Sequence, residues 1–342
     1  MITQALFEQQ TKQFIRCFRT PSPTMMVHTS GSTGTPKPIH VEKKLMEASA
    51  RITCHFLQLT PGDTALLCMP LQFIAAKMMV VRSLVYHLQL LLIAPSGHPL
   101  ATLTTSPVFA AMVPSQVYNS LLVPHERDLL FGIRQLIIGG GAISPTLAEA
   151  LKQAPHHVWS TYGMTETLSH IALCPLNGLH ASSWYHPFPT VNLSLDADNC
   201  LVIDAPEVCR EIITTRDIAQ LRADGCFRIL GRKDNVVCSG GLKIQIEEVE
   251  QRLYSLPVPY QITSVPHPKF GEAIVLIIEA NEKQTEEIGD LCKQYLPKHW
   301  MPKYIITTVL LPLTPTGKPN RIQAKQFAVQ QLEKKNELNT YF

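Results

Sequence analysis

The sequence predicts an α/β protein with two domains, a large one over residues 1–231 and a small α+β one over residues 232–342. First, apolar strand patterns alternate with helical patterns in the large part, which favours a mainly parallel sheet flanked by helices. Second, shorter alternating strands follow over residues 191–214, which predicts an antiparallel element. Third, the pattern changes after Gly231, where a compact unit with its own helices and strands begins.

The expected elements of the large domain are bounded by turn residues such as Gly, Pro and Asp. Strands are expected at Met25–Thr29, Thr64–Met69, Gln89–Ile93, Val108–Met112 and Gln135–Ile138, and helices at Glu42–Phe56 and Met78–Tyr86. In the small domain, we expect Gly231–Asp234 as the link, helices at Ile246–Tyr254 and Glu286–Tyr295, and strands at Ile274–Ala280 and Ile305–Leu311.

The composition excludes several functional classes. With 45% hydrophobic residues and a net charge of +3 over 342 residues, the chain is neither disordered nor a dedicated nucleic-acid binder. The most apolar stretch, Met78–Ala94, is interrupted by polar residues and is too short to cross a bilayer. No secretory signal is recognisable. The nine cysteines contain no C-x-x-C spacing, so we expect buried, reduced thiols in a cytoplasmic protein without a membrane partner.

The strongest motif is a run of hydroxyl residues and glycines, Thr29-Ser30-Gly31-Ser32-Thr33-Gly34-Thr35-Pro36-Lys37. Glycines let backbone N–H groups approach anionic oxygens, hydroxyls add donors and Lys37 adds a charge, so the run suits a polyphosphate. It is not a Walker loop, because Pro38 follows the lysine. We expect the run between a strand and a helix, with a flexible linker as the alternative interpretation.

Five stretches, in order along the chain, resemble the motifs of the adenylate-forming enzymes, which include acyl-CoA synthetases, peptide-synthetase adenylation domains and luciferases. The phosphate loop is similar to TSGSTGxPKG, with Pro38 in place of the last glycine. Residues 160–167 resemble the YGxTE segment. Arg216-Asp217 with Asp224-Gly225 resembles TGD…DG, with Arg216 in place of glycine. Residues 231–241 resemble GRxD…SGG, and residues 315–321 resemble PxTxxGKxxR.

The resemblance implies that a carboxylic acid is activated by ATP and Mg²⁺ as an acyl-adenylate and is then transferred to CoA. It implies Lys318 as the catalytic residue on a mobile C-terminal lid, Asp234 as the hinge, Glu166 as the metal ligand, and Gly240 and Gly241 as CoA contacts. The implied ATP-binding residues are Thr29, Ser30, Gly31, Ser32, Thr33, Gly34, Thr35, Lys37, Gly140, Gly141, Tyr162, Gly163, Met164, Thr165, Asp217 and Arg232.

Each implied role has a chemical reason and a structural alternative. The ring of Tyr162 could stack on adenine or belong to the core. Glu166 could hold Mg²⁺ against phosphate oxygens or mark the start of a helix. Asp217 can accept both ribose hydroxyls, with Arg232 assisting, although both could equally be surface charges. By composition alone, Lys318 is an exposed lysine.

Residues 164–171 resemble a GMTETxSQI run of o-succinylbenzoate–CoA ligases, and residues 82–86 resemble their RSxxY segment. That acid keeps a second carboxylate after activation, which a fixed cation could hold. Arg82 lies in an apolar helix and needs a partner, either that carboxylate or a protein Asp or Glu. Ser169 and His170 are further candidates for the acyl pocket, and Lys77 is another. Phe73 stands where relatives usually have histidine.

Three alternatives stay open: a ligase for another aryl or fatty acid, an enzyme that loads a carrier protein, and a non-catalytic nucleotide-binding module. Only 28 residues precede Thr29, whereas relatives usually carry a substantial subdomain there. We therefore interpret the chain as a minimal ligase, in which a homodimer could cover the exposed flank.

Overall fold

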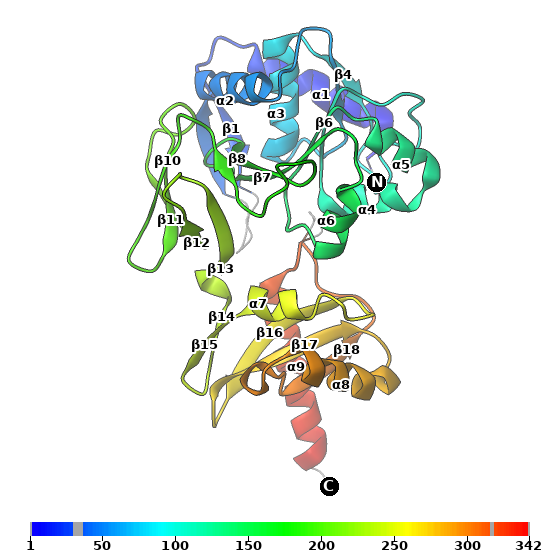
Figure 1. Cartoon of the computed structure of the whole chain (residues 1–342), viewed down its shortest axis with the longest axis vertical. Coiled ribbons are helices and arrows are strands. Elements are labelled where there is room, and N and C mark those ends of the chain that lie inside the picture. Colours follow the sequence, from blue (N-terminus) through cyan, green and yellow to red (C-terminus); the bar gives the residue numbers. More distant parts are fainter. Residues whose placement is uncertain (1, 30–36, 315–317, 341–342) are drawn as a thin grey trace. The chain divides into compact units, whose positions relative to one another are not determined.

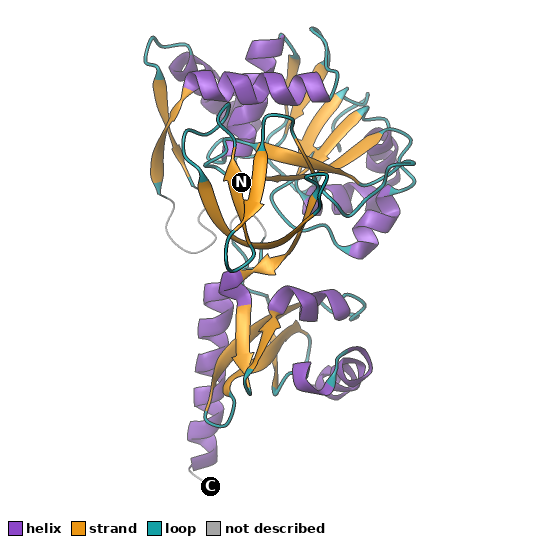
Figure 2. Ribbon diagram, turned by 60° about the vertical axis from the view of Figure 1, so that its left-hand side comes forward, coloured by secondary structure: helices purple, strands orange, loops and turns teal. Residues whose placement is uncertain are grey.

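The computed structural model describes residues 2–29, 37–314 and 318–340 (Figure 1). Contacts divide the chain into two compact units. Unit 1 comprises Met1–Leu195, Val202–Thr214 and Leu221–Arg228, and unit 2 comprises Asp196–Leu201, Thr215–Gln220 and Ile229–Phe342. Because the units alternate along the chain between residues 195 and 229, the predicted domain boundary after Gly231 stays a prediction. Each unit packs helices against strands (Figure 2).

The main sheet of unit 1 has the strand order β4-β3-β5-β6-β7-β8-β9. The strands from β4 to β7 pair in parallel, and β8 and β9 continue the sheet in antiparallel pairs. The mainly parallel sheet predicted from the sequence is therefore confirmed. Its strands are β3 (Thr64–Leu67), β4 (Gln89–Leu92), β5 (Phe109–Met112), β6 (Gln135–Ile138), β7 (His157–Gly163), β8 (His170–Pro175) and β9 (His186–Pro187).

Continuous burial explains the apolar runs of the central strands. Every residue of β5 and of β6 is buried, as expected for parallel strands that helices cover on both faces. Leu66, Ala110, Leu136 and Ile138 belong to one core cluster. The helices of unit 1 are α1 (Gln4–Phe18), α2 (Lys43–Phe56), α3 (Ile74–Tyr86), α4 (Pro114–Leu122), α5 (Pro124–Phe131) and α6 (Pro145–Leu151).

The phosphate-loop motif does not lie between a strand and a helix, as its sequence had predicted. It connects two antiparallel strands, β1 (Thr24–His28) and β2 (Pro38–Glu42), and α2 follows only after β2. Proline is accepted as the first residue of a strand, because its missing N–H costs no internal ladder bond there. A proline after the lysine was thus compatible with a strand that the sequence pattern did not reveal.

A further sheet has the strand order β10-β11-β12-β13, and its residues are divided between the two units. Its strands are β10 (Asn192–Leu195), β11 (Cys200–Asp204), β12 (Ile213–Leu221) and β13 (Phe227–Arg232). β12 carries Asp217 and β13 ends at Arg232, so this sheet supplies two of the residues that the sequence predicts to bind ATP.

The sheet of unit 2 has the order β15-β14-β17-β16, with β18 paired in parallel to β17. Side chains alternate across β17. Ile274, Leu276 and Ile278 pack with α7 and α8, whereas Val275 and Ile277 pack with α9. The elements are β14 (Val236–Ser239), β15 (Leu242–Gln245), β16 (Tyr260–His267), β17 (Gly271–Glu279), β18 (Tyr304–Thr308), α7 (Ile246–Arg252), α8 (Thr285–Tyr295), α9 (Arg321–Thr340) and the 3-10 turns Lys233–Asn235, Glu282–Gln284 and Lys298–Trp300.

The nine cysteines are free, and most are buried, but Cys17 and Cys238 are exposed. The expectation that all of the thiols are buried is therefore wrong for these two positions, and Cys209 is only half-buried. Both lie where the local pattern requires exposure, Cys17 on the outer face of α1 and Cys238 on β14 next to a turn. Among the described residues, none of the helices combines the length and apolar composition that a bilayer crossing needs.

Candidate active site

In unit 1, the sheet topology brings two predicted ATP-binding stretches to one edge. Gly140 and Gly141 follow β6, and Tyr162 and Gly163 end the parallel neighbour β7. Because Ile138 pairs with Ser160, the two stretches leave the sheet at the same level. The carboxyl edge of parallel strands is where α/β proteins bind nucleotides, since loops diverge there and leave backbone N–H groups unpaired.

Tyr162 is half-buried and belongs to an aromatic cluster. Its ring centroid lies 5.1 Å from that of Phe227, edge to face, and 5.9 Å from that of Tyr185. The hydroxyl of Tyr185 lies 2.8 Å from Ser160 Oγ, which fixes this ring. Tyr162 therefore has core contacts and a partly exposed surface. A place in the core and stacking on adenine are compatible interpretations of this residue.

Gly163 is required by the fold itself. A Cβ at this position would lie 2.2 Å from the carbonyl oxygen of Ser169 and 2.5 Å from the Cα of His170. The register between β7 and β8 shifts between Tyr162 and Gly163, which brings the two backbones together. A side chain here would push apart the strand end and the loop that holds the next candidate residues.

The loop between β7 and β8 is organised around the buried Thr167. Its hydroxyl accepts a hydrogen bond from Met164 N at 3.0 Å and lies 2.8 Å from the carbonyl oxygen of Ser169. Thr165 is also buried, whereas the Glu166 side chain between them is exposed. The loop therefore presents one carboxylate outward. Mg²⁺ typically uses one or two carboxylates together with substrate phosphates, so Glu166 fits that role.

Arg82 on α3 is the largest fully buried side chain among the described residues, with 1% of its surface exposed. Its Nη2 donates to Ser169 Oγ at 2.5 Å and lies 3.5 Å from Thr53 Oγ1 on α2. Its Nη1 lies 3.7 Å from the Met79 sulfur. His170 completes the group, with Nε2 3.1 Å from Thr53 Oγ1 and Nδ1 3.3 Å from Ser169 Oγ. We call these four residues, Thr53, Arg82, Ser169 and His170, the Arg82 cluster.

The Arg82 cluster contains a cation and no anion. Within the described part of the chain, no carboxylate pairs with Arg82, and its Nε has no hydrogen-bond partner. Burial lowers the pKa of Arg82 to about 10. Burial, followed by the charge of Arg82, holds the pKa of His170 well below its ordinary value of 6.5. At neutral pH the cluster is therefore a positively charged site with neutral hydrogen-bonding groups around it.

Of the phosphate loop, residues 30–36 lie outside the described residues, so the expectations for Ser30, Gly31, Ser32, Thr33, Gly34 and Thr35 lie there too. The two ends of the loop are described and are joined. Thr29 N donates to the Lys37 carbonyl at 2.9 Å, and Lys37 N donates to Thr29 Oγ1 at 3.1 Å. The side chain of Thr29 is thereby used to close the base of the loop.

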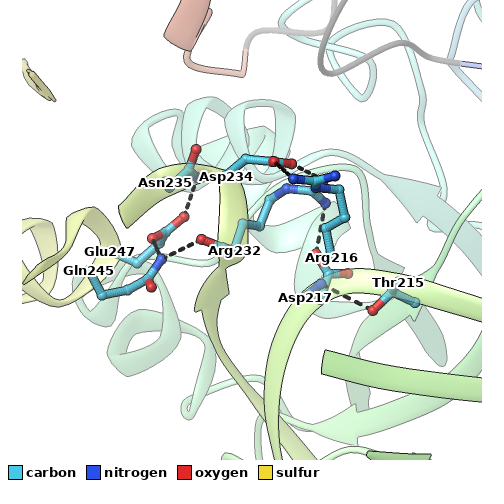
Figure 3. A network of polar contacts seen from close by, with 8 residues as sticks. All are labelled: Thr215, Arg216, Asp217, Arg232, Asp234, Asn235, Gln245 and Glu247. Atoms are coloured by element: carbon cyan, nitrogen blue, oxygen red, sulfur yellow. Dashed lines mark hydrogen bonds and ion pairs between the residues drawn. The ribbon is translucent and has the colours of Figure 1, made fainter. Parts of the chain in front are cut away.

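In unit 2, a network of charged residues surrounds the end of β13 (Figure 3). Arg232 donates to Asp217 Oδ1 at 2.7 Å and to Asp234 Oδ2 at 3.3 Å, and Arg216 pairs with Asp234 Oδ1 at 2.6 Å. Gln245 Nε2 donates to the Arg232 carbonyl at 2.9 Å. The predicted hinge residue Asp234 is thus held by two arginines, one of which, Arg216, replaces a glycine of the resembled motif.

Lys318 is half-buried in the same unit. Its pKa lies below its ordinary value because burial disfavours the charged amine, and because Arg232 repels it more than Asp217 attracts it. The predicted catalytic lysine and the predicted ribose residue therefore share an electrostatic environment within one unit. Residues 315–317 of its loop lie outside the described residues.

Gly240 and Gly241 have a local structural role. They form the two-residue turn of the β14–β15 hairpin, in which Ser239 pairs with Leu242, and their φ angles are +59° and +82°. Positive φ at both central residues defines the turn that suits a right-handed strand twist, and glycine adopts it without a Cβ clash. Both residues are exposed, which leaves their predicted contact with CoA open.

Sequence reasoning missed one member of the Arg82 cluster. Thr53 lies 29 residues before Arg82 and 117 before His170, on a different helix from the first and a different element from the second. Its only sequence signal is a threonine on the apolar face of α2, which is common in helices. Among the described residues, no group of three or more His, Cys, Asp or Glu side chains could hold a metal ion by itself.

Comparison with known proteins places these features in a family. The AMP-binding enzyme family matches residues 7–207. The 2-succinylbenzoate–CoA ligase of Listeria monocytogenes is 27% identical over 325 residues, covering 88% of this chain and 69% of that protein. The corresponding enzyme of Bacillus cereus is 26% identical, and the aligned part covers 81% of this chain and 64% of that protein. The chain thus spans about two thirds of the length of these curated relatives.

Solved structures agree with the family match. An acyl-CoA synthetase (AMP-forming)/AMP-acid ligase II-like protein from Dyadobacter fermentans is 30% identical, with a TM-score of 0.64 and 95% of both chains covered. The o-succinylbenzoate coenzyme A synthetase of Bacillus subtilis, solved with ATP and a magnesium ion, is 22% identical with a TM-score of 0.71. That alignment covers 87% of this chain and 69% of the other, and it shows a shared fold.

Proposed function

Because the chain belongs to the AMP-binding enzyme family of adenylate-forming ligases, we propose that it activates o-succinylbenzoate with ATP and transfers the acyl group to CoA. The observation that carries the choice of acid is the Arg82 cluster. A buried guanidinium without a carboxylate partner is costly, because its desolvation is not offset by an ion pair. An acid that retains a second carboxylate after activation would supply the missing anion.

The donors around Arg82 match such a carboxylate. Arg82 Nε has no partner and Nη2 is bound only to hydroxyls, so the guanidinium can present N–H groups to two carboxylate oxygens. Ser169 contributes a hydroxyl, and the neutral His170 adds no competing charge. The similarity to the 2-succinylbenzoate–CoA ligase of Listeria monocytogenes supports the same acid.

The proposed chemistry has two steps. A substrate carboxylate oxygen attacks the α-phosphorus of ATP, the bond to the β-phosphate bridging oxygen breaks, and pyrophosphate leaves. The sulfur of CoA, having lost its proton, then attacks the acyl carbonyl, and AMP leaves. The first step depends mainly on positioning and charge neutralisation, which Lys318 would supply between the carboxylate and the phosphate. Bound Mg²⁺, held by Glu166, would neutralise phosphate charge.

Asp217 would accept the ribose hydroxyls and Arg232 would support it, because these two side chains are already joined. Between the two steps, rotation about Asp234 would exchange Lys318 for the Gly240–Gly241 turn, and the thiol would enter. An enzyme that loads a carrier protein would use the same first step. The thiol that accepts the acyl group distinguishes it from a CoA ligase.

The test is an acid panel with pyrophosphate release as the readout, measured with and without CoA and followed by mass spectrometry of the thioester. We expect saturation with o-succinylbenzoate and a CoA thioester as the product. Arg82→Leu should raise the KM for this acid by about 10- to 100-fold. The matched control is an analogue with a methyl group in place of the retained carboxylate, and the substitution should leave the KM for this analogue unchanged. An unchanged KM for o-succinylbenzoate would refute the anchoring role.

A further inference from the structure

The loop that carries Lys318 is fixed at both of its ends within unit 2. Thr314 N donates to the Lys318 carbonyl at 2.8 Å, and Asn320 N donates to the Pro312 carbonyl at 2.9 Å. Leu313 and Pro319 form an isolated antiparallel bridge between these two bonds. The described residues of the loop therefore form a closed base directly beneath Lys318.

The incoming end of the loop is tied to β16. Gln261 is 1% exposed and donates from Nε2 to the Pro312 carbonyl at 2.7 Å, while its Oε1 has no hydrogen-bond partner among the described residues. A buried amide oxygen without a hydrogen-bond partner is unfavourable. The one hydrogen bond of this amide goes to the Pro312 carbonyl, which also accepts from Asn320 N and so closes the loop.

The outgoing end of the loop is tied more strongly. Arg321, the first residue of α9, makes two parallel hydrogen bonds with the Glu250 carboxylate of α7, at 2.6 and 2.7 Å. Its Nη1 also donates to the Ile262 carbonyl at 2.9 Å. Both charged side chains are more than three quarters buried, so solvent screens this pair less than a surface pair.

We propose that the Glu250–Arg321 pair, together with Gln261, positions Lys318 for the adenylation step. This inference rests on the proposed function. Arg321 follows Lys318 by three residues, with Pro319 and the helix-capping Asn320 between them, so little backbone freedom separates the anchor from the Lys318 backbone. Displacement of a reacting group by about 1 Å can cost about 100-fold in rate. The three residues do not contact substrate, and they act through Lys318.

The closing experiment measures the two half-reactions separately. Arg321→Lys keeps the charge but loses the two parallel bonds, and Glu250→Gln keeps the shape but loses the charge. We expect each to lower acid-dependent ATP–pyrophosphate exchange, with the acid that the panel selects, by about 10- to 100-fold. Reaction of CoA with the chemically prepared acyl-adenylate should change less than about 3-fold, because that step does not use Lys318. Gln261→Met should show the same pattern with a smaller loss.

A double-mutant cycle separates positioning from general destabilisation. In a Lys318→Ala background, Arg321→Lys should cause no further loss of exchange, because its effect passes through the missing amine. The matched control is Lys325→Met, which removes the Lys325–Glu272 ion pair one turn further along α9 and should leave both half-reactions unchanged. Equal losses in both half-reactions, or additive losses in the cycle, would overturn the inference. Absence of exchange in the unmodified protein with every acid would instead refute the proposed function.

Discussion

The two clusters of charge in this protein differ in how their cations are neutralised. In unit 2, Arg232 and Arg216 are paired with Asp217 and Asp234 at distances of 2.6 to 3.3 Å, and we call these four residues the paired cluster. In unit 1, Arg82 is more deeply buried than either, and its partners are two hydroxyls and a thioether. Paired charges offset each other's desolvation and fix the geometry of the side chains. A buried cation without an anionic partner instead destabilises the protein by its desolvation cost. The unpaired cation is therefore the better indicator of a ligand.

The largest effect is expected at Lys318, whose pKa is lowered by burial and is also influenced by Arg232 and Asp217 of the paired cluster. Lys318→Ala should lower ATP–pyrophosphate exchange by at least about 100-fold, because a positioned charge on the developing anion is lost. Thiolysis of a supplied acyl-adenylate should persist. If the variant exchanged pyrophosphate at the rate of the unmodified protein, Lys318 would have no catalytic role, and the paired cluster beside it would be purely structural.

Arg82→Met should show whether the Arg82 cluster serves acid binding or the stability of the fold. Methionine fills similar volume without a charge, so we expect the free energy of unfolding to stay unchanged or to rise by about 1–4 kcal/mol. Urea denaturation gives this value, and the same variant should bind the dicarboxylic acid poorly. A loss of several kcal/mol would mean that Arg82 already has the partners it needs in the protein.

His170 should make the stability of unit 1 depend on pH in a predictable direction. Its folded pKa lies below 6.5, so the unfolded chain binds more protons than the folded chain in mild acid. The stability that the neutral imidazole contributes is complete above the unfolded pKa and declines as pH falls toward the folded pKa. The free energy of unfolding should therefore decrease as the pH falls from about 7.5 to about 5.5. His170→Gln should remove this part of the pH dependence, and equal slopes for both proteins would contradict it.

The smallest effect is expected at the surface of the paired cluster. Arg216 is 60% exposed, and exposed ion pairs contribute little because water and salt screen them. Arg216→Gln should therefore change the free energy of unfolding by less than about 1 kcal/mol. Thermal unfolding at low and high salt measures it. A larger loss would show that the Arg216–Asp234 pair stabilises more than its exposure indicates.

Four strands of the main sheet, β3 to β6, were predicted, and in β5 and β6 burial of every residue explains the continuous apolar run. Strands β7, β8 and β9 were not predicted. β6 matches the expected Gln135–Ile138 at both ends, with polar or glycine residues bounding it. β16 was missed because Gln261, Thr263 and Ser264 interrupt its apolar pattern, although the structure buries all three. β2 was missed because it begins with Pro38 and holds a polar His40. Strand pairing, which is not local, overrides these local patterns.

The candidate site divides in the same way. The motif residues Tyr162, Asp217 and Lys318 were identified from short sequence patterns, and their roles remain predictions. Thr53 and the Glu250–Arg321 pair were not identifiable as partners, because 29 and 71 residues separate their members from the groups they contact. The sequence also indicated that Arg82 needed a partner, but two kinds of partner were possible.

By itself, the sequence determined the α/β class, the family motifs and the presence of a cation in an apolar helix. These features are encoded locally, in residue type, periodicity and spacing. Only the tertiary structure decided which groups surround that cation and which anchor the loop of Lys318. Burial and charge pairing depend on residues that the chain brings together from distant positions. The absence of a carboxylate beside Arg82 in the described part of the chain is therefore a fact of packing that no local pattern contains.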